Sequence, residues 1–191
     1  MRELSLSFIG GKRVSTPADL AIRPAILQDA AAIARVHVDS WRTTYRDIVP
    51  DEILAKLSYE ERERLWSRVV TDPKQFTFVA EAPARIVGFA NGGRNRGSEA
   101  EYSGELYAVY LVQAHQQRGV GLRLTVAVAR ELERAGMRSM IVWVLRDNPA
   151  CAFYRKLGGQ QVASKLIVMG DRSLEEVAFG WTEIRDLIRP R

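Results

Sequence analysis

The strongest constraint on the fold is a strand, helix and strand pattern near the middle of the chain. Residues 104–112 and 140–145 are runs rich in β-branched and aromatic side chains, which is typical of β-strands. Between them, residues 120–136 have the apolar spacing of an amphipathic helix, and Gly136 marks its end. Because residues 140–145 are apolar throughout, this strand is expected to be covered on both faces. The pattern predicts two locally parallel strands joined by a helix.

The rest of the chain predicts further strands and helices around this unit. Strand-like runs occupy residues 19–25, 76–82, 84–93, 161–169 and 175–184, and helical spacing occurs in residues 28–45, 51–57 and 58–70. Asp29 suits the start of the first helix, and Ser58 with Glu61 resembles a capping box. We therefore expect a polar leader over residues 1–18 and a single domain of the α/β (α+β) class over residues 19–191. Its sheet is predicted to be mixed and mostly antiparallel, with about six to seven strands and about four helices.

Composition excludes several classes of protein. Of the 191 residues, 47% are hydrophobic and 27% are charged, which is typical of a globular domain. The single cysteine, Cys151, excludes an internal disulfide framework and favours a cytoplasmic location. No secretory signal is evident, and no apolar run approaches the roughly 18 residues that span a bilayer, so no membrane partner is expected. The net charge of +5 admits nucleic acid, but basic and acidic residues alternate, as in EERERLWSR, which argues against that partner.

Two glycines, Gly119 and Gly121, stand where the central helix is predicted to begin. Glycine is among the poorest helix formers, so its use here indicates a positive φ or the close approach of a ligand. The free N–H groups of a helix N-terminus bind phosphate well. A P-loop is excluded because no Gly-Lys-Ser/Thr sequence follows Gly121. A dinucleotide-binding fingerprint is disfavoured because Leu124 stands where its third glycine belongs.

Residues 116–121, QQRGVG, resemble the acetyl-CoA-binding motif of the GCN5-related N-acetyltransferases, the GNAT family. Residues 146–159, RDNPACAFYRKLGG, resemble the second motif of that family, and the likeness extends over most of residues 19–181. Three positions depart from the family pattern: Gln113 replaces a proline, Gln117 a glycine and Gly159 a phenylalanine. The first two lie in a loop whose backbone binds the ligand. The third is expected to loosen the packing at the start of the next strand.

The resemblance implies a sheet whose central parallel pair is splayed at the coenzyme A site, and direct transfer of an acetyl group from acetyl-CoA to an amine. Tyr154 matches the tyrosine that protonates the departing sulfur, with an ordinary core tyrosine as the alternative. Glu105 stands where relatives carry a base, with a surface acid at a strand end as the alternative. The implied cofactor-binding residues are Tyr110, Leu111, Val112, Gln113, Gln116, Gln117, Arg118, Gly119, Val120, Gly121, Leu122, Asn148 and Tyr154.

Several of these residues have a second interpretation. A backbone N–H near Tyr110 or Leu111 is expected to polarise the thioester, whereas Arg118 faces the phosphates or is simply solvated. Asn148 contacts the pantetheine arm, caps a helix, or does both. Neither histidine has the spacing of a metal ligand to a Cys, Asp or Glu, so no metal is expected.

On the acceptor side, the first helix resembles a bacterial small-molecule subgroup with a Trp-Arg-x-x-Tyr sequence. Trp41 and Tyr45 are therefore candidates for an aromatic wall around the amine, or else core aromatics. The expected activity is N-acetylation of a small-molecule amine or an amino acid. A protein or peptide N-acetyltransferase, and a non-catalytic acyl-CoA-binding or nucleic-acid-binding relative, remain as alternatives. A homodimer is left open.

Overall fold

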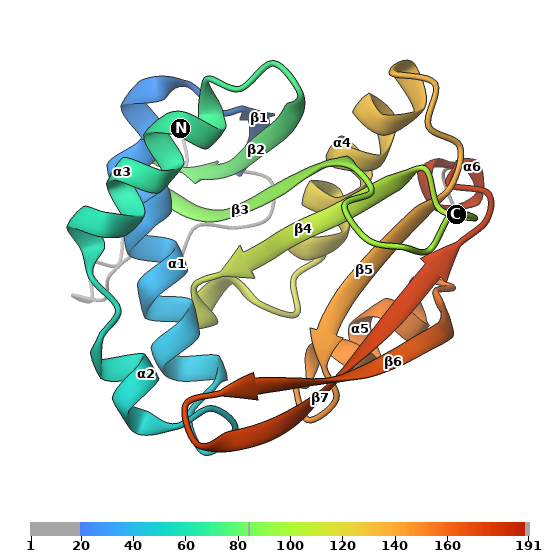
Figure 1. Ribbon diagram of the computed structural model, residues 1–191. Helices are drawn as coiled ribbons and strands as arrows, with labels where there is room; N and C mark the ends of the chain where they lie inside the picture. The colour runs from blue at the N-terminus through green and yellow to red at the C-terminus, as the bar shows by residue number, and fades with distance from the viewer. Residues whose placement is uncertain (1–19, 84, 190–191) are drawn as a thin grey trace, which may run out of the picture.

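The computed structural model describes residues 20–83 and 85–189, which form one mixed sheet of seven strands with helices on both faces (Figure 1). The strand order is β1-β2-β3-β4-β5-β7-β6, antiparallel except for the pair β4–β5. The expected mixed, mostly antiparallel sheet with one parallel pair is confirmed. The expected leader, residues 1–18, lies outside the described residues. The strands are β1 (Ala21–Pro24), β2 (Gln75–Ala82), β3 (Arg85–Arg94), β4 (Gly104–Leu111), β5 (Met140–Leu145), β6 (Gln160–Met169) and β7 (Arg172–Trp181).

Helices cover the two faces of the sheet separately. The main helices are α1 (Ala30–Thr44), α3 (Tyr59–Val70) and α4 (Val120–Arg134). Three helices are shorter: α2 (Asp51–Ala55), α5 (Ala150–Lys156) and α6 (Arg185–Ile188). The 3-10 turns are η2 (Leu27–Asp29) and η3 (Gln113–His115). Leu124, Val128 and Leu132 of α4 recur every four residues and are fully buried against one face. Ile33 of α1 and Trp66 of α3 are buried against the other face (Figure 1). No helix of the described residues is long and apolar enough to cross a membrane.

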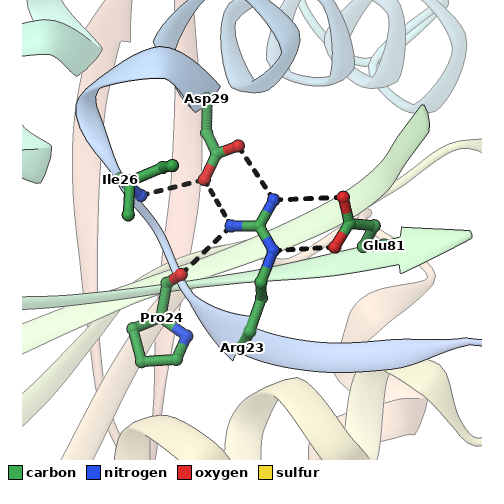
Figure 2. Close-up of polar contacts among 5 residues, drawn as sticks. All are labelled: Arg23, Pro24, Ile26, Asp29 and Glu81. Atoms are coloured by element: carbon green, nitrogen blue, oxygen red, sulfur yellow. Dashed lines mark hydrogen bonds and ion pairs between the residues drawn. The ribbon is translucent and has the colours of Figure 1, made fainter. Parts of the chain in front are cut away.

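Arg23 joins β1, β2 and the segment that leads into α1 (Figure 2). Its guanidinium donates to Asp29 at 2.6 Å and to Glu81 at 2.7 Å, and the Ile26 N–H donates to the same Asp29 carboxylate at 2.9 Å. Although burial opposes ionisation, these donors hold the pKa of Asp29 below its usual range. The carboxylate of Asp29 therefore serves Arg23 and the turn before α1, and it makes no side-chain cap at the N-terminus of α1.

The hairpin of β6 and β7 closes the far edge of the sheet and reaches α2. Its turn contains Gly170, at φ +62°, where an added Cβ would lie 3.0 Å from Glu52 Oε1. Partly buried residues of the hairpin, such as Ile167 and Met169, pack with buried residues of α1 and α2. The hairpin tip and the first helices therefore form one unit beside the sheet (Figure 1).

The prediction that Gly159 loosens the packing before β6 is wrong, because the ring of Trp181 occupies the space. A Cβ on Gly159 would lie 2.7 Å from Trp181 Cζ2. The indole N–H of Trp181 donates to the carbonyl of Leu157 at 3.1 Å, and the side chain is buried. An aromatic ring is thus supplied to this part of the core from β7.

Candidate active site

The parallel strands β4 and β5 separate after only two residue pairs. Gly104 pairs with Met140 and Glu105 with Ile141, and beyond this point the two strands diverge. On its other side, β4 stays paired with β3, with Tyr107 inserted as a β-bulge between Leu106 and Ala108. The divergence leaves a wedge that holds a cavity of about 40 Å³. The residues around this cavity are Tyr45, Tyr107, Ala108, Val109, Tyr110, Val142, Trp143, Val144, Asn148, Ala150 and Tyr154.

Tyr154 of α5 lies at the wedge with its ring packed in the main core. The side chain is 5% exposed, and its ring contacts the rings of Phe153, Phe179 and Trp181. Burial raises the pKa of the Tyr154 hydroxyl well above its usual value, and neighbouring Tyr45 and Cys151 raise it further. Tyr154 therefore remains a neutral phenol, able to donate a proton or a hydrogen bond.

Tyr45, Tyr110 and Asn148 line the same cavity. Removal from water raises the pKa of Tyr45 and of Tyr110, so both remain protonated. Asn148 is buried, and its Oδ1 accepts a hydrogen bond from the Ala150 N–H at 2.9 Å. The capping role expected for Asn148 at the start of α5 is thus present, while its amide group also lines the cavity.

The glycine loop ends in a left-handed residue directly before α4. Gly119 has φ +77° and precedes the first residue of the helix, Val120, whose side chain is buried. Gln117, which replaces a glycine of the family pattern, also adopts a positive φ, +58°. The loop thus keeps a left-handed conformation at a position where glycine is absent.

Gly121 differs from Gly119 in what surrounds it. Its φ is not positive, and an added Cβ would make ordinary contacts of 3.4 Å with Phe153 and 3.5 Å with Leu111. The folded chain therefore does not itself demand glycine at position 121.

The backbone at the end of β4 is held by side chains from two directions. Ser40 Oγ and Gln116 Nε2 both donate to the carbonyl oxygen of Leu111, at 3.3 and 3.1 Å, whereas the Val112 N–H donates to Val87 of β3. Because successive residues of a strand point their polar groups to opposite edges, Leu111 directs its own toward the wedge. This polar edge at Leu111 is an element of the predicted coenzyme A site.

Positive charge gathers around the loop before α4. Arg85 lies within 3.4 Å of the ring of His115, and burial, Arg85 and Arg118 together lower the pKa of His115. Arg123 donates to the carbonyl of Leu20 at 2.9 Å, so it also fastens β1 to α4. Leu122 is 40% exposed, and Gln113 lies in the 3-10 turn that precedes the loop.

Glu105 is neither free nor at the surface. Its side chain is buried, and Arg96 donates to it three times, from Nη2 at 2.7 Å, from Nε at 3.2 Å and from the backbone N–H at 2.9 Å. The guanidinium of Arg96 also lies 3.7 Å from the centre of the Tyr107 ring. The description of Glu105 as a surface acid is therefore wrong, and nothing in the sequence indicated Arg96 as its partner.

Trp41 and Tyr45 occupy neighbouring positions on α1 and just after it, with ring centroids 4.6 Å apart. Tyr45 is buried at the wedge, whereas Trp41 is partly exposed and lines a second cavity, of about 320 Å³, among α1, the α2–α3 region and β6. Buried His37 lies behind them and accepts a hydrogen bond at Nδ1 from Trp66. Burial, and then the charge of Arg62, lower its pKa to about 4. Among residues 20–83 and 85–189, no three His, Cys, Asp or Glu side chains gather into a possible metal site.

Comparisons with known proteins agree with this geometry. Residues 94–168 match the family described as FR47-like protein. The chain is 38% identical over 169 residues to Uncharacterized N-acetyltransferase YuaI of Bacillus subtilis, a match that covers 88% of this chain and 96% of that protein. A GCN5-related N-acetyltransferase structure from Rhodopseudomonas palustris has a TM-score of 0.67 at 24% identity and covers 90% of this chain and 98% of its own. The structure of yncA from Salmonella typhimurium with its cofactor acetyl-CoA has a TM-score of 0.59 at 24% identity, covering 85% and 93%.

Proposed function

Because the chain belongs to the GCN5-related N-acetyltransferase family and is an acetyl-CoA-dependent acyltransferase, we propose that its acceptor is the primary amine of a small molecule or an amino acid. The observation that carries the proposal is the wedge. Strands β4 and β5 separate beyond Glu105, and the neutral phenol of Tyr154 lies at the gap. A donor that stays protonated at neutral pH is what a departing thiolate requires.

The residues present fit acetyl-CoA. The N-terminus of α4 offers unpaired N–H groups and positive potential to phosphates, and Gly121 in its first turn adds no side chain that would obstruct them. The polar edge at Leu111 is suited to the amide groups of a pantetheine arm. When bound, acetyl-CoA supplies the acetyl group and a thiolate leaving group.

The chain's own groups then have separate tasks. The amine nitrogen bonds to the acetyl carbon as the bond from that carbon to sulfur breaks, and Tyr154 gives its proton to the sulfur. The backbone N–H at Leu111 is assigned to the carbonyl oxygen, where a fixed donor stabilises developing negative charge. Asn148 orients the ligand while its Oδ1 holds the start of α5.

Glu105 is assigned to the amine proton, which it takes through water. Its backbone makes the last pair between β4 and β5, and three hydrogen bonds from Arg96 fix its carboxylate outside the cavity of the wedge. A carboxylate so fixed is better suited to receiving a proton by way of water than to moving toward the amine. Trp41 and Tyr45 are assigned to the wall between the reacting amine and the rest of the acceptor.

Calorimetric titration tests the proposal. The purified chain is titrated with acetyl-CoA and CoA, with NADH, ATP and a short DNA duplex as controls, and amines are then screened by release of free thiol. Binding of acetyl-CoA together with thiol release on addition of an amine is the expected result. Acetyl-CoA binding without turnover of any amine or peptide would favour a non-catalytic acyl-CoA-binding protein, and turnover of peptides alone would favour a peptide acetyltransferase.

A further inference from the structure

The larger cavity beside the wedge combines apolar walls with positive charge. It holds about 320 Å³, and Ile53, Leu57 and Met169 contribute its apolar lining. Lys56 and Arg62 line it as well, with Glu61 as its one acidic residue. Two cations against one carboxylate leave the lining with a net positive charge.

This cavity adjoins the wedge through two neighbouring aromatic rings. Trp41 lines the larger cavity, Tyr45 lines the wedge, and their ring centroids are 4.6 Å apart. An acceptor whose amine reaches the wedge can therefore place its other end in the larger cavity only if several bonds separate the two ends.

Arg62 of α3 differs from Arg23 and Arg42, the half-buried arginines near α1 that have partners. Its side chain is half-buried, and within the described residues no hydrogen bond or ion pair engages its guanidinium. Arg42, by contrast, donates to the carbonyl of Leu57 at 2.8 Å, and Arg23 is fully engaged by two carboxylates. A half-buried guanidinium that faces a cavity and has no acceptor is prepared for an anion from outside the chain.

The surroundings of Arg62 supply further donors but few acceptors. His37 is 8% exposed and accepts from Trp66 at Nδ1, so its proton is on Nε2, which has no hydrogen-bond partner. The indole Nε1 of Trp41 is buried and interacts with the hydroxyl of Tyr110. Because His37 stays neutral, it leaves the positive charge of Arg62 unchanged. The Nε2–H of His37 therefore adds one unsatisfied donor behind Trp41, and no carboxylate of the chain pairs with Arg62 among the described residues.

We propose that the acceptor is a primary amine whose carboxylate lies several bonds from its amino group, and that Arg62 binds this carboxylate. This inference rests on the proposed function. Lys56 adds long-range attraction at the cavity, and Trp41 with the apolar walls covers the carbon chain between the two ends. Arg62 is thus a residue that determines specificity, and the chemistry remains with the groups of the wedge.

The test uses the ω-amino acids from glycine to 6-aminohexanoate as acceptors, each beside its primary amide, with kcat/KM measured by thiol release. The expected result for the wild-type chain is that a longer member exceeds its own amide by about 10-fold or more, because an ionised pair adds at least one charge-assisted hydrogen bond. Arg62→Gln is expected to remove this preference by lowering kcat/KM on the ω-amino acid far more than on its amide. Arg62→Lys should keep part of it. Arg64→Gln, the same change on the exposed side of α3, is the matched control and should keep all of it.

Separate outcomes overturn the inference and the proposed function. Thermal melting and acetyl-CoA titration of each variant verify that it is folded and binds the co-substrate. Acetylation of amides or of α,ω-diamines at rates equal to or above those of the ω-amino acids would overturn the carboxylate proposal alone, as would a preference that survives Arg62→Gln. Acetyl-CoA binding with no turnover of any of these compounds would also overturn it. Absence of acetyl-CoA binding in the wild-type chain would overturn the proposed function itself.

Discussion

The two sides of the wedge between β4 and β5 are built from different materials. The proposed cofactor side consists of backbone: the strand edge at Leu111, the left-handed turn at Gly119 and Gly121 in the first turn of α4. The acceptor side consists of side chains that come from separate elements, such as Trp41 of α1, Arg62 of α3 and Met169 of β6. A binding site made of backbone needs only a few glycines at fixed spacing. A binding site made of side chains changes its shape and charge with each substitution in the helices and strands that form it.

The difference explains how much could be predicted from the sequence. Glycines at the start of a helix are visible because they violate helix propensity, so the loop and the parallel pair beside it were predictable. The acceptor side gave no such signal. In the sequence, Arg62 is one of several charged residues that predict an exposed helix face. Only the packing of α3 against α1 places it beside Trp41.

The partners of single residues were also beyond the sequence. Arg96 follows β3 in an ordinary polar loop, and no periodicity connects it with Glu105. The contact of Trp181 with Gly159 depends on the antiparallel order of β6, β7 and β5. Long-range pairing of this kind is set by tertiary structure, which local patterns do not encode.

The largest effect is expected at Tyr154, whose side chain lines the cavity of the wedge. Tyr154→Phe removes the proton assigned to the thiolate, so turnover should fall by roughly 10²-fold while acetyl-CoA affinity stays nearly unchanged. Steady-state kinetics and calorimetry measure the two quantities. Tyr102→Phe is the matched control, because Tyr102 is also a buried tyrosine but packs against Gly180, away from the wedge. Equal turnover in the two variants would remove Tyr154 from the mechanism.

The next effect concerns the scaffold of the acceptor side, which depends on how α1 begins. Asp29→Asn weakens the charged hydrogen bonds from Arg23, so the free energy of unfolding at pH 7 should fall by about 2 kcal/mol. The pKa of Asp29 is lowered in the folded chain, so its contribution is fully present above the unfolded value of about 3.9 and is lost as the pH falls through the lower folded value. Urea unfolding at several pH values measures this. A difference between wild type and variant that persists in full at the lowest pH would contradict the assignment.

On the cofactor side, Gly121→Val is expected to weaken acetyl-CoA binding by about 10-fold or more, because branched carbons would fill the space proposed for the ligand. Calorimetry of the folded variant gives the affinity. Gly121→Ala separates space from folding: its Cβ makes only ordinary contacts, and alanine is the better helix former, so the free energy of unfolding should not fall. Wild-type affinity in Gly121→Val would show that the ligand does not approach the backbone at this position.

The smallest effect distinguishes a glycine that is needed only for its positive φ from one that also lies beside a bound ligand. Gly119→Ala meets no atom within 4 Å but must hold φ near +77°, which costs an alanine about 1 kcal/mol. Gly136, at the other end of α4, has φ +82° and equally open surroundings, so Gly136→Ala should lose a similar free energy of unfolding in urea. Acetyl-CoA affinity is the readout that separates them, since only Gly119 adjoins the N–H groups assigned to phosphate. If both variants kept full affinity after correction for stability, the loop would be a helix start and nothing more, and the cofactor side would rest on Gly121 and the strand edge at Leu111.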